Sequence, residues 1–99
     1  PLHSLLLLLV QDADAAMDTI AAGLNTDDFA AVARTAHALV SSAGNVGAMR
    51  VSKLARALEM TAQASDRTGA EAILATLQRN WTQTREMIGQ QEDAWRAVA

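Results

Sequence analysis

Apolar residues recur every three or four positions along nearly the whole chain, which is the spacing of one buried stripe on an α-helix. The first stretch predicts a helix over about residues 2–23, with a buried stripe of Leu5, Leu6, Leu9, Ala13, Ala16, Met17 and Ile20. Off this stripe, and predicted to face solvent, lie Asp12, Asp14 and Asp18. The run LLLLLV at residues 5–10 is predicted to be a buried helix turn, because a membrane span needs about 20 apolar residues.

Three further helices are predicted, over about residues 27–43, 48–64 and from 70 toward the C-terminus. Asn25 or Thr26 is expected to cap the second helix, with Asp27 and Asp28 in its first turn, where the helix dipole favours anions. The segments GNVG (44–47) and SDRTG (65–69) are predicted to be turns, since glycine lowers helix propensity and permits a positive φ.

The later helices carry their own apolar stripes. The third is predicted to bury Val51, Leu54, Ala55 and Leu58, and the fourth Ile73, Leu74, Leu77, Trp81, Thr84, Ile88, Trp95 and Val98. Gly89 is expected to loosen the fourth helix, and both tryptophans are expected in the core or at its edge. Short connections favour antiparallel neighbours, so the predicted fold class is all-α, an antiparallel up-down four-helix bundle forming a single domain over residues 1–99.

Composition narrows the function. The chain has 99 residues and no cysteine, which excludes disulfides, thiolate metal sites and cysteine nucleophiles. A net charge of −3 and the absence of a basic stripe with aromatics argue against nucleic acid as a partner. No basic segment of a signal peptide precedes the leucine run. We therefore expect a cytoplasmic protein without direct membrane contact, and interpret the start at Pro1 as that of a trimmed fragment.

The segment AHALVSSAGNVGA (36–48) places a histidine among small residues. At about 100° per residue, the core side of the second helix comprises Phe29, Val32, Ala36, Leu39 and Ala43. His37 lies about 130° from the centre of that side and is predicted to point outward. Arg34 and Ser41 share its face, and Ala30 and Gly44 complete the strip.

Small neighbours make room for a partner to approach the ring of His37. Imidazole is largely neutral at pH 7, so it offers a nucleophilic nitrogen, and covalent catalysis by histidine is established chemistry. The alternative is an ordinary surface histidine. We expect no metal site, because the other histidine of the chain, His3, is close to the N-terminus.

This segment resembles the signature of histidine phosphotransfer (HPt) domains, A-H-x-L-K-G-S-S/A-x-N-x-G-A. The positions that match are Ala36, His37, Leu39, Ser42, Ala43, Asn45, Gly47 and Ala48. The downstream LARALE (54–59) is similar to the L-x-x-x-L-E segment that follows in the family. The likeness extends over the whole chain in length and helix layout, and its specific part is residues 36–59.

The resemblance implies that His37 accepts a phosphoryl group on Nε2 from the aspartate of a receiver domain and passes it to another receiver aspartate. The receivers would belong to response regulators or to a hybrid sensor kinase. In the second case this chain would be the C-terminal cytoplasmic module of a membrane-bound kinase. No nucleotide, cofactor or kinase activity of its own is expected, and Mg²⁺ is expected on the receiver only. The predicted phosphoryl-neighbouring or docking residues are Arg34, Val40, Ser41 and Gly44, and Asn45 and Gly47 are predicted to be structural.

Two positions depart from the family pattern. Val40 stands where the family has lysine, and Ser41 stands where it has glycine. A lysine would place a cation beside the phosphoryl group, and a glycine would allow the closest approach of a receiver. These departures keep one alternative open, a docking module that binds and regulates a receiver or an enzyme without phosphotransfer. A structural helical bundle without a site is a further alternative, independent of them.

Overall fold

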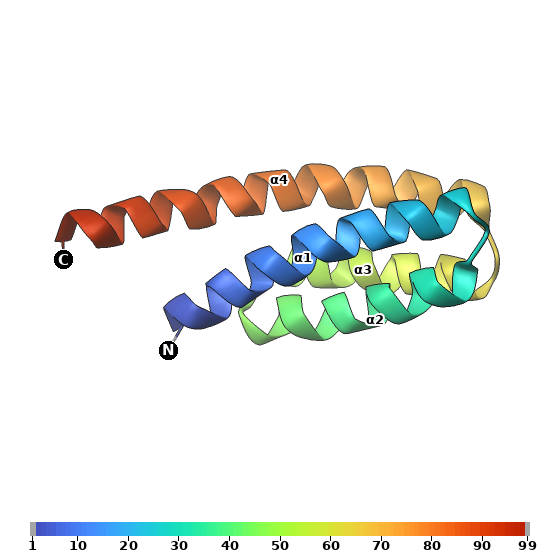
Figure 1. Cartoon of the computed structure of the whole chain (residues 1–99), viewed down its shortest axis with the longest axis horizontal. Helices are drawn as coiled ribbons and strands as arrows, with labels where there is room; N and C mark the ends of the chain where they lie inside the picture. Colours follow the sequence, from blue (N-terminus) through green and yellow to red (C-terminus); the bar gives the residue numbers. More distant parts are fainter. Residues whose placement is uncertain (1, 99) are drawn as a thin grey trace.

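Four antiparallel helices form the part of the chain that the structure describes. The computed structural model describes residues 2–98, apart from the side chains of Leu2, His3, Leu5 and Trp95. Within that range the helices are α1 (Leu2–Asn25), α2 (Phe29–Asn45), α3 (Met49–Gln63) and α4 (Arg67–Val98). They run up and down in chain order: α2 packs on α1 and α3, and α4 packs on α3 and α1 (Figure 1). The predicted all-α, up-down four-helix bundle is confirmed.

The apolar stripes of the helices meet in one core. Its buried residues include Leu9, Ala13, Met17 and Ile20 of α1, Val32, Ala36, Leu39 and Ala43 of α2, Val51, Ala55 and Leu58 of α3, and Leu74, Leu77, Trp81 and Ile88 of α4. Small residues let the helices approach closely. A Cβ atom at Gly23 of α1 would lie 2.7 Å from Cγ2 of Val32 on α2, so only glycine fits there without a shift.

The ends of the bundle are less buried than the spacing predicts. In the LLLLLV run Leu9 is buried, but Leu7 is 41% and Leu8 is 53% exposed, so the prediction of a fully buried turn was wrong. Val98, predicted to be in the core, is 86% exposed. The reason for Val98 is length: α4 has 32 residues and α3 has 15, so the C-terminal part of α4 runs past the α2–α3 turn (Figure 1). The predicted core side chains Leu5 and Trp95 lie outside the described residues. No helix within residues 2–98 combines the length and apolar character that a membrane crossing needs.

The turn between α1 and α2 is capped by a residue other than the predicted ones. Asp27 has a φ of 58°, which ends the helical path, and α2 begins at Phe29. The N-cap is Asp28, whose side chain accepts a hydrogen bond from the backbone N–H of Ala31 at 3.1 Å. The prediction that Asn25 or Thr26 caps α2 was therefore wrong, because α1 itself continues to Asn25.

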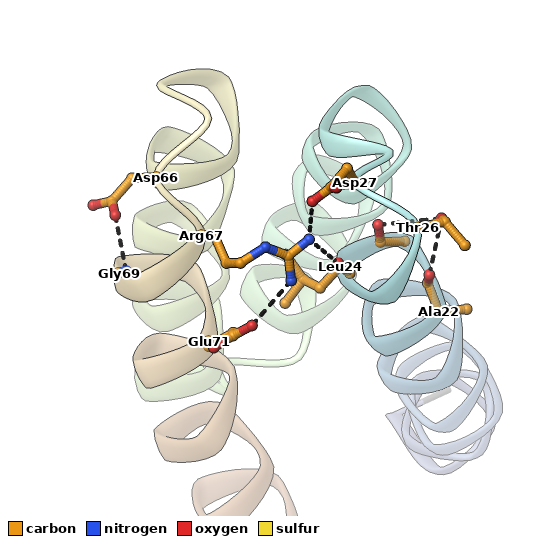
Figure 2. A network of polar contacts seen from close by, with 9 residues as sticks. Ala22, Leu24, Thr26, Asp27, Asp66, Arg67, Gly69 and Glu71 are labelled. Atoms are coloured by element: carbon orange, nitrogen blue, oxygen red, sulfur yellow. Dashed lines mark hydrogen bonds and ion pairs between the residues drawn. The ribbon is translucent and has the colours of Figure 1, made fainter.

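The turn between α3 and α4 is shorter than SDRTG predicts. The carboxylate of Asp66 accepts a hydrogen bond from the backbone N–H of Gly69 at 2.9 Å, and α4 begins at Arg67 rather than near residue 70. Arg67 also joins the two turns at this end of the bundle: its guanidinium donates to the carbonyl of Leu24 and to the carboxylate of Asp27, besides Glu71 on its own helix (Figure 2).

One of the acidic residues of α1 is not on a solvated face. Trp81 is 4% exposed, as its place in the core requires, and its indole N–H donates to Oδ1 of Asp14 at 2.9 Å. Oδ2 of Asp14 lies 3.3 Å from the guanidinium of Arg85. Asp14 therefore serves the contact between α1 and α4, whereas Asp12 and Asp18 are exposed as predicted.

The α2–α3 turn requires a glycine for conformation rather than for space. Gly47 has a φ of +79°, and no atom lies within 4 Å of a Cβ built on it. We expect Gly47→Val to lower the free energy of unfolding by about 1 to 3 kcal/mol, because a β-branched residue is strained at this φ. Gly89 is the control: it lies within α4 with open space around it, so Gly89→Ala should raise that free energy by about 0.5 to 1 kcal/mol. Urea unfolding of both variants tests this, and unchanged stability of Gly47→Val would contradict a structural role.

Candidate functional site

His37 lies on the outer side of α2, near the middle of the helix. The opposite side of α2 is buried through Val32, Ala36, Leu39 and Ala43. The imidazole is 67% exposed, as the helical spacing predicts. One turn away in either direction stand Ala33 and Ser41, whose short side chains leave the ring open to an approaching molecule.

Glu59 of α3 contacts the ring of His37. Nδ1 of His37 and Oε2 of Glu59 are 2.8 Å apart. Glu59 is the last residue of the LARALE segment, and its side chain is only 12% exposed. The pair is separated by 22 residues in sequence, and it meets because α3 returns antiparallel to α2. The sequence matched Glu59 to a family segment but assigned it no role, because nothing local to it indicates a histidine partner.

This contact determines which nitrogen of His37 is available. An ionised carboxylate only accepts hydrogen bonds, so Nδ1 carries the proton and donates it to Glu59. The neutral ring then has its lone pair on Nε2, the nitrogen directed away from Glu59. The arrangement also places a negative charge where positive charge develops on the ring during nucleophilic attack. Glu59 therefore holds the imidazole with Nε2 directed away from α3.

Close packing of α2 on α3 supports this geometry. The hydroxyl of Ser52 on α3 donates to the backbone carbonyl of Val40 on α2 at 2.9 Å. At Gly44, a Cβ would be an ordinary 3.7 Å from Oγ of Ser52. Val40 itself is half-buried and packs against the core, so its side chain is not a free surface residue.

The other predicted site residues divide into two groups. Arg34, Ser41 and Gly44 are exposed on the outer side of α2, near His37. Asn45 and Gly47 lie at the C-terminal end of α2 and in the turn after it, away from the ring. Within the described residues, the side chain of Arg34 has no hydrogen bond or ion pair.

A shallow groove of about 270 Å³ runs between α1 and α2 on the side away from Glu59. Its lining mixes apolar residues with polar ones: Ala15, Ala16, Ala38 and Leu39, and Asp12, Thr19, Thr35 and Ser42. The groove lies next to the exposed side of α2, so α1 can take part in a contact made there. Elsewhere in the described part of the chain, no three His, Asp or Glu side chains are grouped so that they could hold a metal ion.

The fold and the site together define a class of protein: a four-helix bundle with an exposed histidine, His37, held by the carboxylate of Glu59 on the neighbouring helix. The family model described as Hpt domain matches residues 4–94, and the chain belongs to this family. Comparisons with curated proteins and with solved structures gave no match. Hpt domains act in phosphorelays by histidine phosphotransfer and interact with receiver domains of response regulators, and this general role is therefore that of the chain.

Proposed function

We propose that His37 is the phosphoryl carrier of a multistep phosphorelay. It accepts the group from the aspartate of one receiver domain, of a response regulator or of a hybrid sensor kinase, and delivers it to the aspartate of another. One observation carries the proposal: the exposed imidazole of His37 donates from Nδ1 to Glu59, which leaves Nε2 free and outward. This is the arrangement of an activated nucleophile with an orienting partner.

The transfer step follows from this arrangement. The lone pair of Nε2 attacks the phosphorus of the receiver's aspartyl phosphate and forms the N–P bond. The P–O bond to the aspartate breaks, and its electron pair leaves with the carboxylate. The ring gains a positive charge that Glu59 stabilises through the Nδ1 proton. In the second transfer the carboxylate of the next receiver attacks phosphorus, and the N–P bond returns its electrons to Nε2.

We assign Mg²⁺ to the receiver rather than to this chain. The carboxylate within hydrogen-bond distance of His37 is that of Glu59, and it is occupied by the Nδ1 proton. The chain contributes the nucleophile and the docking surface, and the receiver supplies the electrostatic environment that activates the acyl phosphate.

The docking surface in this proposal is the outer side of α2 around His37, with Arg34, Ser41 and Gly44, together with the exposed edge of α1. Ser41→Trp should weaken receiver binding by at least about tenfold, because bulk beside the nucleophile meets the partner and not the core. Binding is measured by titration with the receiver domain that transfers to the wild type.

Ala75→Trp is the matched control for Ser41→Trp. Ala75 is also exposed, but it lies on α4, which in the described part of the chain does not pack against α2. Both variants should keep the circular dichroism of the wild type. Normal receiver affinity of Ser41→Trp would place the interface on another face.

The relay itself is tested by phosphotransfer from a panel of phosphorylated receiver domains of the source organism. We expect at least one receiver to label the chain, with a label that is labile to acid, stable to base and located on the peptide that contains His37. A chain that no receiver labels, under conditions in which another Hpt domain is labelled, would overturn the proposal.

A further inference from the structure

The register of α2 against α3 is constant beside His37. His37 pairs with Glu59, and Gly44 lies across from Ser52. These two contacts are seven residues apart on both helices, so the positions between them are matched as well. Arg56 is three residues before Glu59, which brings it level with the position three residues after His37, about 4.5 Å along the helix axis.

Arg56 also lies on the correct edge of α3. It follows Ser52 by four residues and precedes Glu59 by three, and residues at these spacings share one face of a helix. Ser52 and Glu59 both contact α2. Arg56 therefore lies on the edge of α3 that borders α2, on the same side of the helix as the partner of the imidazole.

The side chain of Arg56 is exposed and uncommitted. Within residues 2–98 it makes no hydrogen bond or ion pair. Arginine matches the oxygens of a phosphoryl group with two parallel N–H donors, which lysine cannot do. On α2 the corresponding level is occupied by the uncharged Val40.

The charge distribution around His37 favours an anion. The segment from Phe29 to Gln63 has four basic residues, Arg34, Arg50, Lys53 and Arg56, and one acidic residue, Glu59, which the Nδ1 proton occupies. The chain as a whole has a net charge of −3. The acidic residues of α1 nearest to α2, such as Asp12, lie along the other side of α2, in the groove with Ser42.

We propose that Arg56 of α3 binds the phosphoryl group carried on Nε2 of His37 and supplies the cation that Val40 does not provide. The inference rests on the proposed function, since it presupposes a phosphoryl group on His37. The group carries close to two negative charges at pH 7. Arg56 lowers the free energy of its dianionic form and so shifts the transfer equilibrium toward phosphohistidine.

The test measures the phosphoryl group directly and needs no receiver. The chain is phosphorylated with the small-molecule donor phosphoramidate, and the second ionisation of the phosphoryl group is followed by ³¹P NMR. Removal of a nearby cation makes the dianion less stable. We therefore expect Arg56→Gln to lower the second acid dissociation constant about threefold, as for one partly exposed ion pair. The difference should shrink when salt is raised from about 0.05 M to about 0.5 M.

Lys53→Gln is the matched control, because it removes the same charge one turn farther along α3. It should change the dissociation constant less than half as much as Arg56→Gln, and Arg56→Lys should keep most of the wild-type value. The double variant Val40→Lys with Arg56→Gln should recover the wild-type dissociation constant, because the new lysine on α2 supplies a positive charge at the level that Arg56 occupies on α3. A merely structural effect of Arg56 would change circular dichroism and unfolding without moving this constant.

Two results would overturn the inference. The first is an equal second acid dissociation constant of the phosphoryl group in Arg56→Gln and Lys53→Gln. The second is an Arg56→Gln effect that disappears when Glu59→Gln is also present, because Arg56 would then act through Glu59. Neither result bears on the relay. Conversely, a chain that phosphoramidate labels on His37 and no receiver labels would refute the proposed function and leave the role of Arg56 measurable.

Discussion

A chain in which His37 is replaced by glutamine should accept no phosphoryl group from any receiver domain, whereas its fold should be unchanged. An amide nitrogen has no lone pair available for attack on phosphorus, so the loss is complete rather than partial. The side chain is 67% exposed and, within the described residues, its one hydrogen bond is to Glu59, so the free energy of unfolding should fall by no more than about 1.5 kcal/mol. Transfer of ³²P from a phosphorylated receiver and thermal unfolding measure the two quantities.

His3→Gln is the matched control for this experiment, because the sequence has two histidines and His3 is the other. It should be labelled like the wild type. His37→Gln should still bind the receiver, since the rest of the docking surface is intact. If His37→Gln fails to accept phosphate yet regulates the partner as the wild type does, the chain is a docking module. Labelling of His37→Gln at the wild-type rate would exclude His37 as the carrier.

The four helices could be predicted from the sequence because an apolar stripe depends only on residues within one helix. The residues at which each helix begins and ends could not be predicted in this way. The four consecutive residues from Asn25 to Asp28 are all of types that favour the N-cap position. Asp28 is the N-cap of α2, because the positive φ of Asp27 places the start of the helix after it. Arg67 was read as part of a turn. Its place at the start of α4 depends on Asp66, and its guanidinium reaches the α1–α2 turn, a contact 43 residues away in sequence.

The candidate site shows the same division between local and long-range information. The outward direction of His37 follows from the helix wheel alone, and the structure places it so. The role of Glu59 depends on the register of α3 against α2, which no pattern within either helix contains. Asp14 was assigned to a solvated face for the same reason, because its partner Trp81 is 67 residues away.

The spacing of apolar residues also could not predict which side chains are exposed at the ends of the bundle. Val98 continues the apolar spacing of α4, yet it faces solvent because the neighbouring helices end earlier, whereas Leu8 is exposed because it lies on the outer side of α1, next to the buried Leu9. A helical stripe shows which side of a helix is apolar and not how far the adjacent helices extend. The length of α4 beyond α3 is a property of the whole assembly.

Replacing Glu59 by alanine should slow phosphoryl transfer from the receiver to His37 by about 10- to 100-fold, as when the carboxylate that orients a metal-binding histidine is removed. Without the carboxylate the ring can rotate, its proton can occupy either nitrogen, and no negative charge balances the ring during attack. Glu59→Gln should lose nearly as much. Its amide can accept from Nδ1–H or donate to a bare Nδ1, so it no longer selects one tautomer.

Single-turnover transfer with the receiver in excess measures this rate, and ¹⁵N chemical shifts of the imidazole report the tautomer. Gln63→Ala is the control, because Gln63 is exposed four residues farther along α3, at the end of the helix. Receiver affinity should be unchanged in Glu59→Ala, since Glu59 is only 12% exposed and acts through His37. An equal loss of affinity and rate would make Glu59 a docking contact. Wild-type transfer by Glu59→Ala, with both tautomers present, would mean that the 2.8 Å hydrogen bond holds the ring without contributing to its reactivity.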